Sequence, residues 1–182
     1  LGCYGDGGCI FANDGELARS MRAISQHGSF PGSDSIVCVG LNSRLDTFQA
    51  AILIEKMTIF EAELEARQKV SDWYSNLLQD WVVVPRLNEN YSSSWANYTI
   101  LTPHREAIQK ALTAANVASR IYYSVPVHLQ PAYERFGLGL GSLPVTEDTS
   151  STALSLPMHA YLAHDTVRKI SDIIIRVISE RS

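Results

Sequence analysis

The longest uninterrupted helical pattern in the sequence runs from Leu45 to about Asp80, and it contains neither proline nor glycine. Apolar residues recur along it at spacings of four and three, as the buried face of an amphipathic α-helix requires. These residues are Leu53, Met57, Phe60 and Leu64. A helix of this length is typical of an element that bends or links two domains. The plain interpretation of its apolar face is core packing.

A turn rich in capping residues leads into this pattern, since residues 40–49 read GLNSRLDTFQ. Two overlapping capping boxes predict that the helix begins between residues 43 and 46. They are formed by Ser43 with Asp46 and by Asp46 with Gln49. Asn42 and Arg44 add an amide and a forked cation beside free backbone N–H groups, a combination suited to an oxyanion or a phosphate. An ordinary capped helix with a solvated arginine explains the same residues, and the stretch alone favours that simpler interpretation.

Composition bounds the class of protein. The 182 residues are 46% hydrophobic, enough for one core or two small domains. A net charge of -4, with scattered lysines and arginines, argues against nucleic acid as the main partner. No segment reaches the roughly 18 apolar residues that a membrane span requires. The three cysteines lack paired metal-ligand spacing, so we expect no metal site and reduced thiols in a cytoplasmic protein.

The first 45 residues predict a short strand and a helix. The apolar run at residues 9–12 is bounded by turn residues, as a strand would be. Asn13, with Glu16 three residues later, has the spacing of a helix N-terminus, and His27-Gly28 is typical of a helix end.

The second half of the chain predicts the order helix, strand, strand, helix, strand, helix. The three strand candidates are residues 81–85, 94–102 and 117–123. Thr102-Pro103 predicts the start of a helix between the second and third strands. The last helix carries an apolar stripe made of Val167, Ile170, Ile174 and Val177. We therefore expect an α/β sandwich.

Four motifs, in order and covering essentially the whole chain, resemble the DegT-type (DegT/StrS) sugar aminotransferases. They are LGCYGDGGC at residues 1–9, GLNSRLDTFQAAIL at 40–53, YYSVPVHLQPAY at 122–133 and LSLPMH at 154–159. The resemblance implies an α/β fold of fold type I, like that of aspartate aminotransferase, with pyridoxal phosphate (PLP) as cofactor. It implies transfer of an amino group, usually from glutamate, to a nucleotide-linked keto sugar. It also implies a homodimer with active sites at the subunit boundary.

The resemblance assigns roles only where this sequence matches the motifs. Asn42 corresponds to an asparagine that reaches the cofactor phosphate across the dimer, and Arg44 to an arginine that faces phosphate or substrate. Tyr123 and His128 correspond to a tyrosine and a histidine of the loop that borders the sugar pocket. Without the resemblance, the simpler interpretation of His128 is a loop histidine that caps a turn or packs against its neighbours. Tyr122, in the same substrate-binding set, stands where several relatives acting on sugar acids carry histidine, which weakens any case for a carboxylated sugar.

The family's Schiff-base lysine precedes the position of Leu1 by two residues, and the aspartate that pairs with the pyridine nitrogen lies further upstream. We therefore expect a C-terminal portion that is inactive alone. Its predicted parts are a remnant of the large domain (1–45), a long linking helix (46–80) and a small α/β domain (81–182). The alternative is a non-catalytic module that binds a nucleotide sugar or dimerises.

Overall fold

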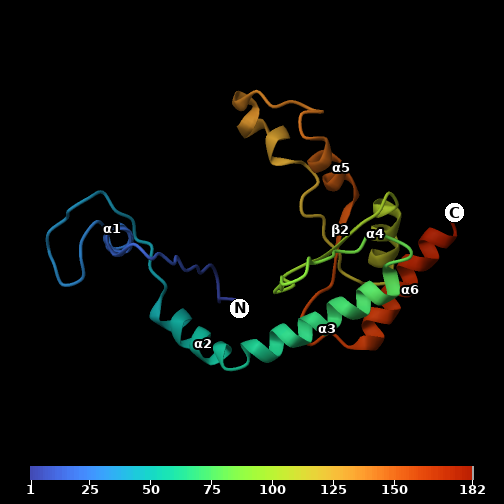
Figure 1. The fold of residues 1–182 in the computed structure, drawn as a ribbon, viewed down its shortest axis with the longest axis horizontal. Coiled ribbons are helices and arrows are strands. Elements are labelled where there is room, and N and C mark those ends of the chain that lie inside the picture. Colours follow the sequence, from blue (N-terminus) through green and yellow to red (C-terminus); the bar gives the residue numbers. More distant parts are fainter. Residues whose placement is uncertain (182) are drawn as a thin grey trace. The chain divides into compact units, whose positions relative to one another are not determined.

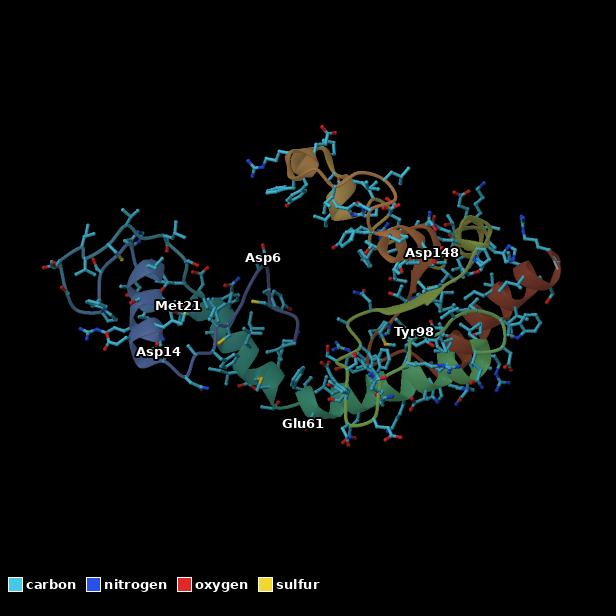
Figure 2. The ribbon with its side chains drawn as sticks, turned by 45° about the horizontal axis from the view of Figure 1, so that its top comes forward. Asp6, Asp14, Met21, Glu61, Tyr98 and Asp148 are labelled. Carbon is cyan, nitrogen blue, oxygen red and sulfur yellow. The ribbon has the colours of Figure 1, made fainter. Side chains whose placement is uncertain are left out.

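A computed structural model describes residues 1–181 as two compact units, which meet in the sequence between Glu61 and Ala62. The first unit contains the helices α1 (Gly15–Ser25) and α2 (Thr47–Met57). The second contains a small sheet and the remaining helices, except for the first two residues of α3 (Phe60–Leu78) (Figure 1). Glu61, labelled in Figure 2, is the last residue of the first unit.

Helix α1 confirms the helix predicted near residue 13, but its cap differs by one residue. The carboxylate of Asp14, which is labelled in Figure 2, accepts hydrogen bonds from the backbone N–H of Glu16 at 2.9 Å and of Leu17 at 3.0 Å. Asp14 is therefore the N-cap, and the prediction of Asn13 was wrong. Both residue types can cap a helix, but the carboxylate adds a favourable charge at the positive end of the helix dipole. At the other end, His27 and Gly28 adopt positive φ, as the predicted stop requires.

The strand predicted at residues 9–12 does not form. Ile10 is 77% and Phe11 90% exposed, and the described residues pair no segment with them. A strand is stable only when its backbone N–H and C=O groups find a neighbouring strand. An apolar run therefore remains irregular in this unit.

The long helical run is divided into α2 and α3 (Phe60–Leu78) by a turn at Thr58 and Ile59. The turn interrupts the linking helix predicted over 46–80 and is consistent with the predicted bend. The Thr58 hydroxyl donates to the Glu55 carbonyl at 2.7 Å, a local bond that competes with the helical pattern. The predicted start is confirmed, because Asp46 and Gln49 form a capping box.

The apolar stripe predicted on this run is not the buried one. Helix α2 buries no residue within the described chain, and Met57 is 56% exposed. The buried face of α3 lies further along the helix and consists of Val70, Ser71, Tyr74 and Leu78. Spacing identifies a possible apolar face, but only the partners decide which part of it is covered.

The sheet of the second unit pairs β1 (Tyr98–Leu101) with β2 (Ala153–Leu156) in antiparallel register, with Tyr98 opposite Leu156. Single-residue bridges extend it on both sides: Val83 pairs with Leu101, and Arg120 pairs with Ser155. The strand predicted at 94–102 is therefore shorter than expected. Those at 81–85 and 117–123 are reduced to these bridges.

Three helices pack with this sheet around one core: α3, α4 (Arg105–Ala114) and α6 (His164–Ser179). The stripe predicted on α6 is largely confirmed, since Val167, Ile170 and Ile174 are buried. Val177 packs at the margin of the core, and its neighbour Ile178 is the more deeply buried residue. The α/β sandwich is thus mostly helical, with a small sheet.

Three shorter elements lie between the two strands in sequence. They are the 3-10 helices η1 (Val127–Leu129) and η2 (Pro131–Phe136) and the α-helix α5 (Pro144–Thr152). The predicted site residues of the second unit lie on or near them.

Tyr98 is the polar centre of the core. Its side chain is fully buried, its ring stacks on Tyr74 with centroids 5.0 Å apart, and its hydroxyl lies 2.8 Å from Ser75 Oγ. Burial raises the pKa of Tyr98 to about 12, and the nearby Asp72 charge acts in the same direction, whereas the Ser75 hydrogen bond lowers it.

Candidate functional site

The five predicted site residues fall into two groups, one in each unit. Asn42 and Arg44 lie on the turn before α2. Tyr122 and Tyr123 lie on the segment that follows the Arg120 bridge, and His128 lies on η1.

The turn that carries Asn42 is fixed to the C-terminal end of α1. Asn42 itself pairs with Gln26 in an isolated antiparallel bridge. Residues on both sides of it make backbone hydrogen bonds to the same helix end. These bonds run from Leu41 N–H to Ile24 O at 2.7 Å, from His27 N–H to Leu41 O at 2.9 Å and from Ser43 N–H to Ser25 O at 3.0 Å. The position of Asn42 therefore depends on α1 as well as on its own capping turn.

Two glycines permit this close crossing. A Cβ atom on Gly28, where φ is +85°, would lie 1.8 Å from the Cys38 carbonyl oxygen. A Cβ atom on Gly40 would lie 2.0 Å from the Gly28 nitrogen. Neither distance is possible for a real side chain, so both positions require glycine.

Asn42 and Arg44 form a local pair of exposed polar side chains. Arg44 Nε and Nη2 donate to Asn42 Oδ1 at 3.2 and 3.1 Å. The Asn42 amide N–H groups and the remaining guanidinium N–H groups have no protein partner among the described residues. The pair thus presents only donors and one positive charge, and this donor set fits a phosphate.

The two tyrosines lie together on an exposed segment. Tyr122 is 46% and Tyr123 73% exposed, and their rings meet edge to face with centroids 5.5 Å apart. No hydrogen bond joins either side chain to His128 within the described residues. The structure therefore places the tyrosines close together in the chain but does not link them to the histidine.

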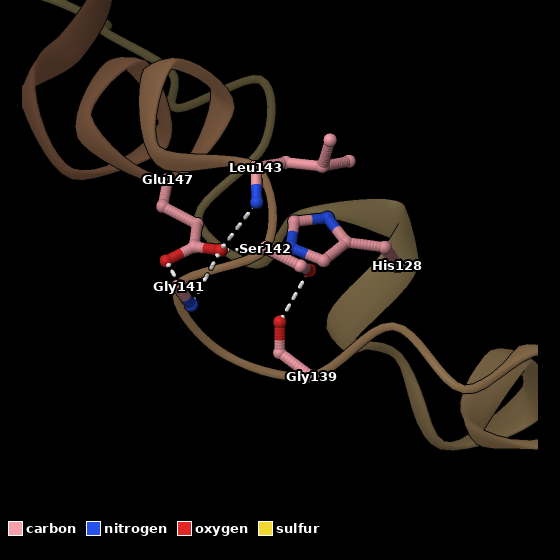
Figure 3. Close-up of polar contacts among 6 residues, drawn as sticks. All are labelled: His128, Gly139, Gly141, Ser142, Leu143 and Glu147. Carbon is pink, nitrogen blue, oxygen red and sulfur yellow. Dashed lines mark hydrogen bonds and ion pairs between the residues drawn. The ribbon is translucent and has the colours of Figure 1, made fainter.

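His128 is buried, with only 6% of its side chain exposed, and its Nε2 lies 3.0 Å from Glu147 Oε1 on α5 (Figure 3). Sequence reasoning missed Glu147. The available signal was an acidic residue in the first turn of a helix that begins with Pro144, a common pattern at helix starts. That signal indicates a helix start but does not name a partner 19 residues away in the chain.

Glu147 also holds the loop between η2 and α5. Gly141 N–H lies 2.9 Å from both carboxylate oxygens, and Leu143 N–H donates to Oε1 at 3.2 Å (Figure 3). The Gly141 hydrogen bond, followed by the His128 hydrogen bond, lowers the pKa of Glu147 below its usual value, against a smaller effect of burial. The side chain is therefore held as a carboxylate that accepts several donors.

The part of the chain that the structure describes contains neither a candidate membrane-spanning helix nor a candidate metal site. No helix there is both long and apolar enough to cross a membrane. No group of three or more His, Cys, Asp or Glu side chains within residues 1–181 is placed to hold a metal ion.

This chain is similar to known proteins in both sequence and structure. The sequence model of the DegT/DnrJ/EryC1/StrS aminotransferase family matches residues 1–175. The chain is 43% identical over 171 residues to the UDP-2-acetamido-2-deoxy-3-oxo-D-glucuronate aminotransferase of Pseudomonas aeruginosa, a match that covers 93% of this chain and 46% of that protein.

Solved structures give the same result. A DegT DnrJ EryC1 StrS aminotransferase from Brucella abortus matches 98% of this chain and 48% of its own, with a TM-score of 0.92 and 44% identity. DesV from S. venezuelae matches 97% of this chain and 48% of its own, with a TM-score of 0.91 and 31% identity.

The chain spans about half the length of these relatives and corresponds to their C-terminal portion. The structural matches confirm the expected fold type I over that half. Homologues of the family bind PLP or its amino form, pyridoxamine phosphate. The family match over nearly the whole chain and the two structural matches above 30% identity lead to one conclusion: the chain belongs to the DegT/DnrJ/EryC1/StrS aminotransferase family.

Proposed function

We propose that, in a polypeptide of the relatives' full length, these residues form the C-terminal part of a PLP-dependent aminotransferase. The reaction would move an amino group, with glutamate as donor, to a keto sugar linked to a nucleoside diphosphate. The observation that carries the proposal is the exposed donor pair of Asn42 and Arg44, since it fits a phosphate and stands in the motif that matches the family. The active assembly in this proposal is a homodimer.

The residues of this chain bind and orient the reactants. The Asn42 amide and the Arg44 guanidinium hold a phosphate through charge-assisted hydrogen bonds. PLP, when bound, supplies the electron sink for the transfer. The exposed rings of Tyr122 and Tyr123 offer faces and hydroxyls to the sugar. In this proposal His128 contacts the same sugar, as its place in the family motif implies.

The test uses a chimera in which the N-terminal half of the Brucella relative precedes Leu1. We expect Asn42→Ala and Arg44→Ala each to weaken PLP affinity or raise the substrate KM by about 10- to 100-fold, because a charge-assisted hydrogen bond is worth roughly 1.5–3 kcal/mol. Arg22→Ala is the matched control, since Arg22 is an exposed arginine on α1 of the same unit. Unchanged affinity and KM in both site variants would leave only the helix-capping role.

Measurements on the 182-residue chain alone distinguish this proposal from the alternative of a non-catalytic module. Its lysines are Lys56, Lys69, Lys110 and Lys169, all within helices. Lys56 Nζ is engaged by the Gly2 carbonyl at 2.7 Å. We therefore expect no transaminase activity and no stoichiometric trapping of PLP on one lysine by borohydride. Calorimetry that detects tight binding of a nucleotide sugar by this chain would support the module instead.

A further inference from the structure

Glu147 connects the predicted sugar-pocket histidine on η1 with the loop that precedes α5. One of its oxygens, Oε1, receives His128 Nε2 at 3.0 Å, Gly141 N–H at 2.9 Å and Leu143 N–H at 3.2 Å (Figure 3). Three donors converge on one oxygen, and the side chain of Glu147 is 16% exposed. The carboxylate is thus the common acceptor for η1 and for the loop before α5.

This geometry determines the protonation pattern of the imidazole. A carboxylate accepts hydrogen bonds and has no proton to donate, so Nε2 must carry the hydrogen of the 3.0 Å contact. In a neutral imidazole the other nitrogen, Nδ1, is then an acceptor. Nδ1 has no protein hydrogen-bond partner among residues 1–181.

We infer that Glu147 is a positioning residue: it holds His128 in the tautomer protonated at Nε2 and directs Nδ1 as an acceptor toward a hydroxyl or N–H group of the sugar. The inference deepens the proposed function and rests on it for the identity of the ligand. The positioning itself rests only on the contacts of Glu147, His128 and the loop at Gly141.

The loop before α5 is held by the same carboxylate that holds His128. Gly141 has φ of +88°, and the next residue, Ser142, donates its hydroxyl to Gly139 O at 2.5 Å. The Glu147 carboxylate therefore accepts hydrogen bonds both from the tight turn at Gly141 and from the His128 imidazole (Figure 3). Loss of the carboxylate should release both together, whereas loss of the imidazole should leave the turn bound.

Nuclear magnetic resonance of the 182-residue chain tests the positioning without any activity. At about pH 8, where an ordinary imidazole is neutral, we expect ¹⁵N shifts of His128 that report a protonated Nε2 and a proton there that exchanges slowly with water. Glu147→Ala should abolish the slow exchange and shift the amides of residues 141–143. Asp148→Ala is the control, because Asp148 (labelled in Figure 2) is an exposed carboxylate on the same helix without a side-chain hydrogen bond among the described residues.

Glu147→Gln separates positioning from folding. Its amide oxygen can still accept from Nε2, so the protected proton should be partly restored. A wild-type His128 protonated at Nδ1, or ring and loop signals unchanged in Glu147→Ala, would overturn the inference. If Glu147→Ala fails to fold, the wild-type tautomer and the Glu147→Gln variant still decide.

Kinetics of the chimera test the consequence for the substrate. We expect Glu147→Ala and His128→Ala each to raise the nucleotide-sugar KM by about tenfold, with a smaller effect on kcat. The double variant should fall short of the summed effects of the two single variants, because part of the Glu147 effect passes through the histidine. Additive effects would refute positioning. An inactive wild-type chimera would count against the proposed function, while the resonance data would still decide on Glu147.

Discussion

At the scale of single residues, the crossing of Gly28 and Gly40 controls where Asn42 lies. The two glycines let the chain before the α2 turn run against the end of α1. A side chain at either position would separate the two segments. The donor pair of Asn42 and Arg44 therefore depends on residues that never touch a ligand.

Gly40→Ala should destabilise this turn, because an ideally placed Cβ atom at residue 40 would lie only 2.0 Å from the Gly28 nitrogen and would have to displace it. We expect a loss of about 1–3 kcal/mol, as for other strained backbone positions, together with faster amide exchange at Leu41 and Ser43. Gly8→Ala is the control, because a Cβ there meets nothing within 4 Å. Equal exchange rates and thermal midpoints in the two variants would contradict the role of the crossing.

The raised pKa of Tyr98 predicts that the free energy of unfolding falls at alkaline pH. Its folded pKa of about 12 exceeds the ordinary value of 10.0, so the neutral phenol is favoured in the folded state. This contribution to the free energy of unfolding is complete below pH 10 and is lost as the pH rises from about 10 to about 12. Absorbance of tyrosinate should show Tyr98 titrating late, and Tyr98→Phe should flatten the alkaline fall in stability. An identical alkaline midpoint in both proteins would exclude this cause.

At the scale of elements, the two helices of the first unit begin where local side-chain acceptors bind their first N–H groups. Helix α2 begins with the Asp46–Gln49 box, and α1 begins with the Asp14 carboxylate. The turn at Thr58–Ile59 then separates α2 from α3. These local bonds determine the ends of the helices, while packing determines which of their faces is covered.

Asp14→Ala should lower stability by about 1 kcal/mol, the usual cost of losing an N-cap side chain. Asn13→Ala should leave stability nearly unchanged, since the bonds to Glu16 and Leu17 come from Asp14. Chemical denaturation of the two variants measures the difference. A greater loss in Asn13→Ala would return the cap to the residue that the spacing first indicated.

At the scale of the whole molecule, the two units differ in how much of their apolar surface is covered. The second has a closed core of helices and sheet. In the first, α2 buries no residue within the described chain, and Phe48, Ile54 and Met57 are 75%, 66% and 56% exposed. Apolar surface on this scale is typical of an interface.

We therefore expect the 182-residue chain to self-associate at micromolar concentration, as measured by sedimentation velocity. The double variant Phe48→Ser with Ile54→Ser should shift the chain toward monomer. Val145→Ser is the control, because Val145 is 79% exposed but lies on α5 in the other unit. A clean monomer for the wild type would contradict the expectation.

Features that depend on neighbours in the chain were predictable from the sequence. The Asp46–Gln49 box joins residues three apart, and the stripe of Val167, Ile170 and Ile174 follows from the period of one helix. The family resemblance also followed from short motifs, and the family match over residues 1–175 confirms it.

Only the tertiary structure decided which residues meet across long separations. The segment predicted as a strand at residues 9–12 pairs with no other segment among residues 1–181, and His128 contacts Glu147 although no local pattern specifies that pair. Likewise, the position of Asn42 depends on backbone bonds to the end of α1. Short-range hydrogen bonds and helical periodicity depend only on residues that are close together in the sequence. Strand pairing and burial depend on partners whose place is known only when the chain has folded.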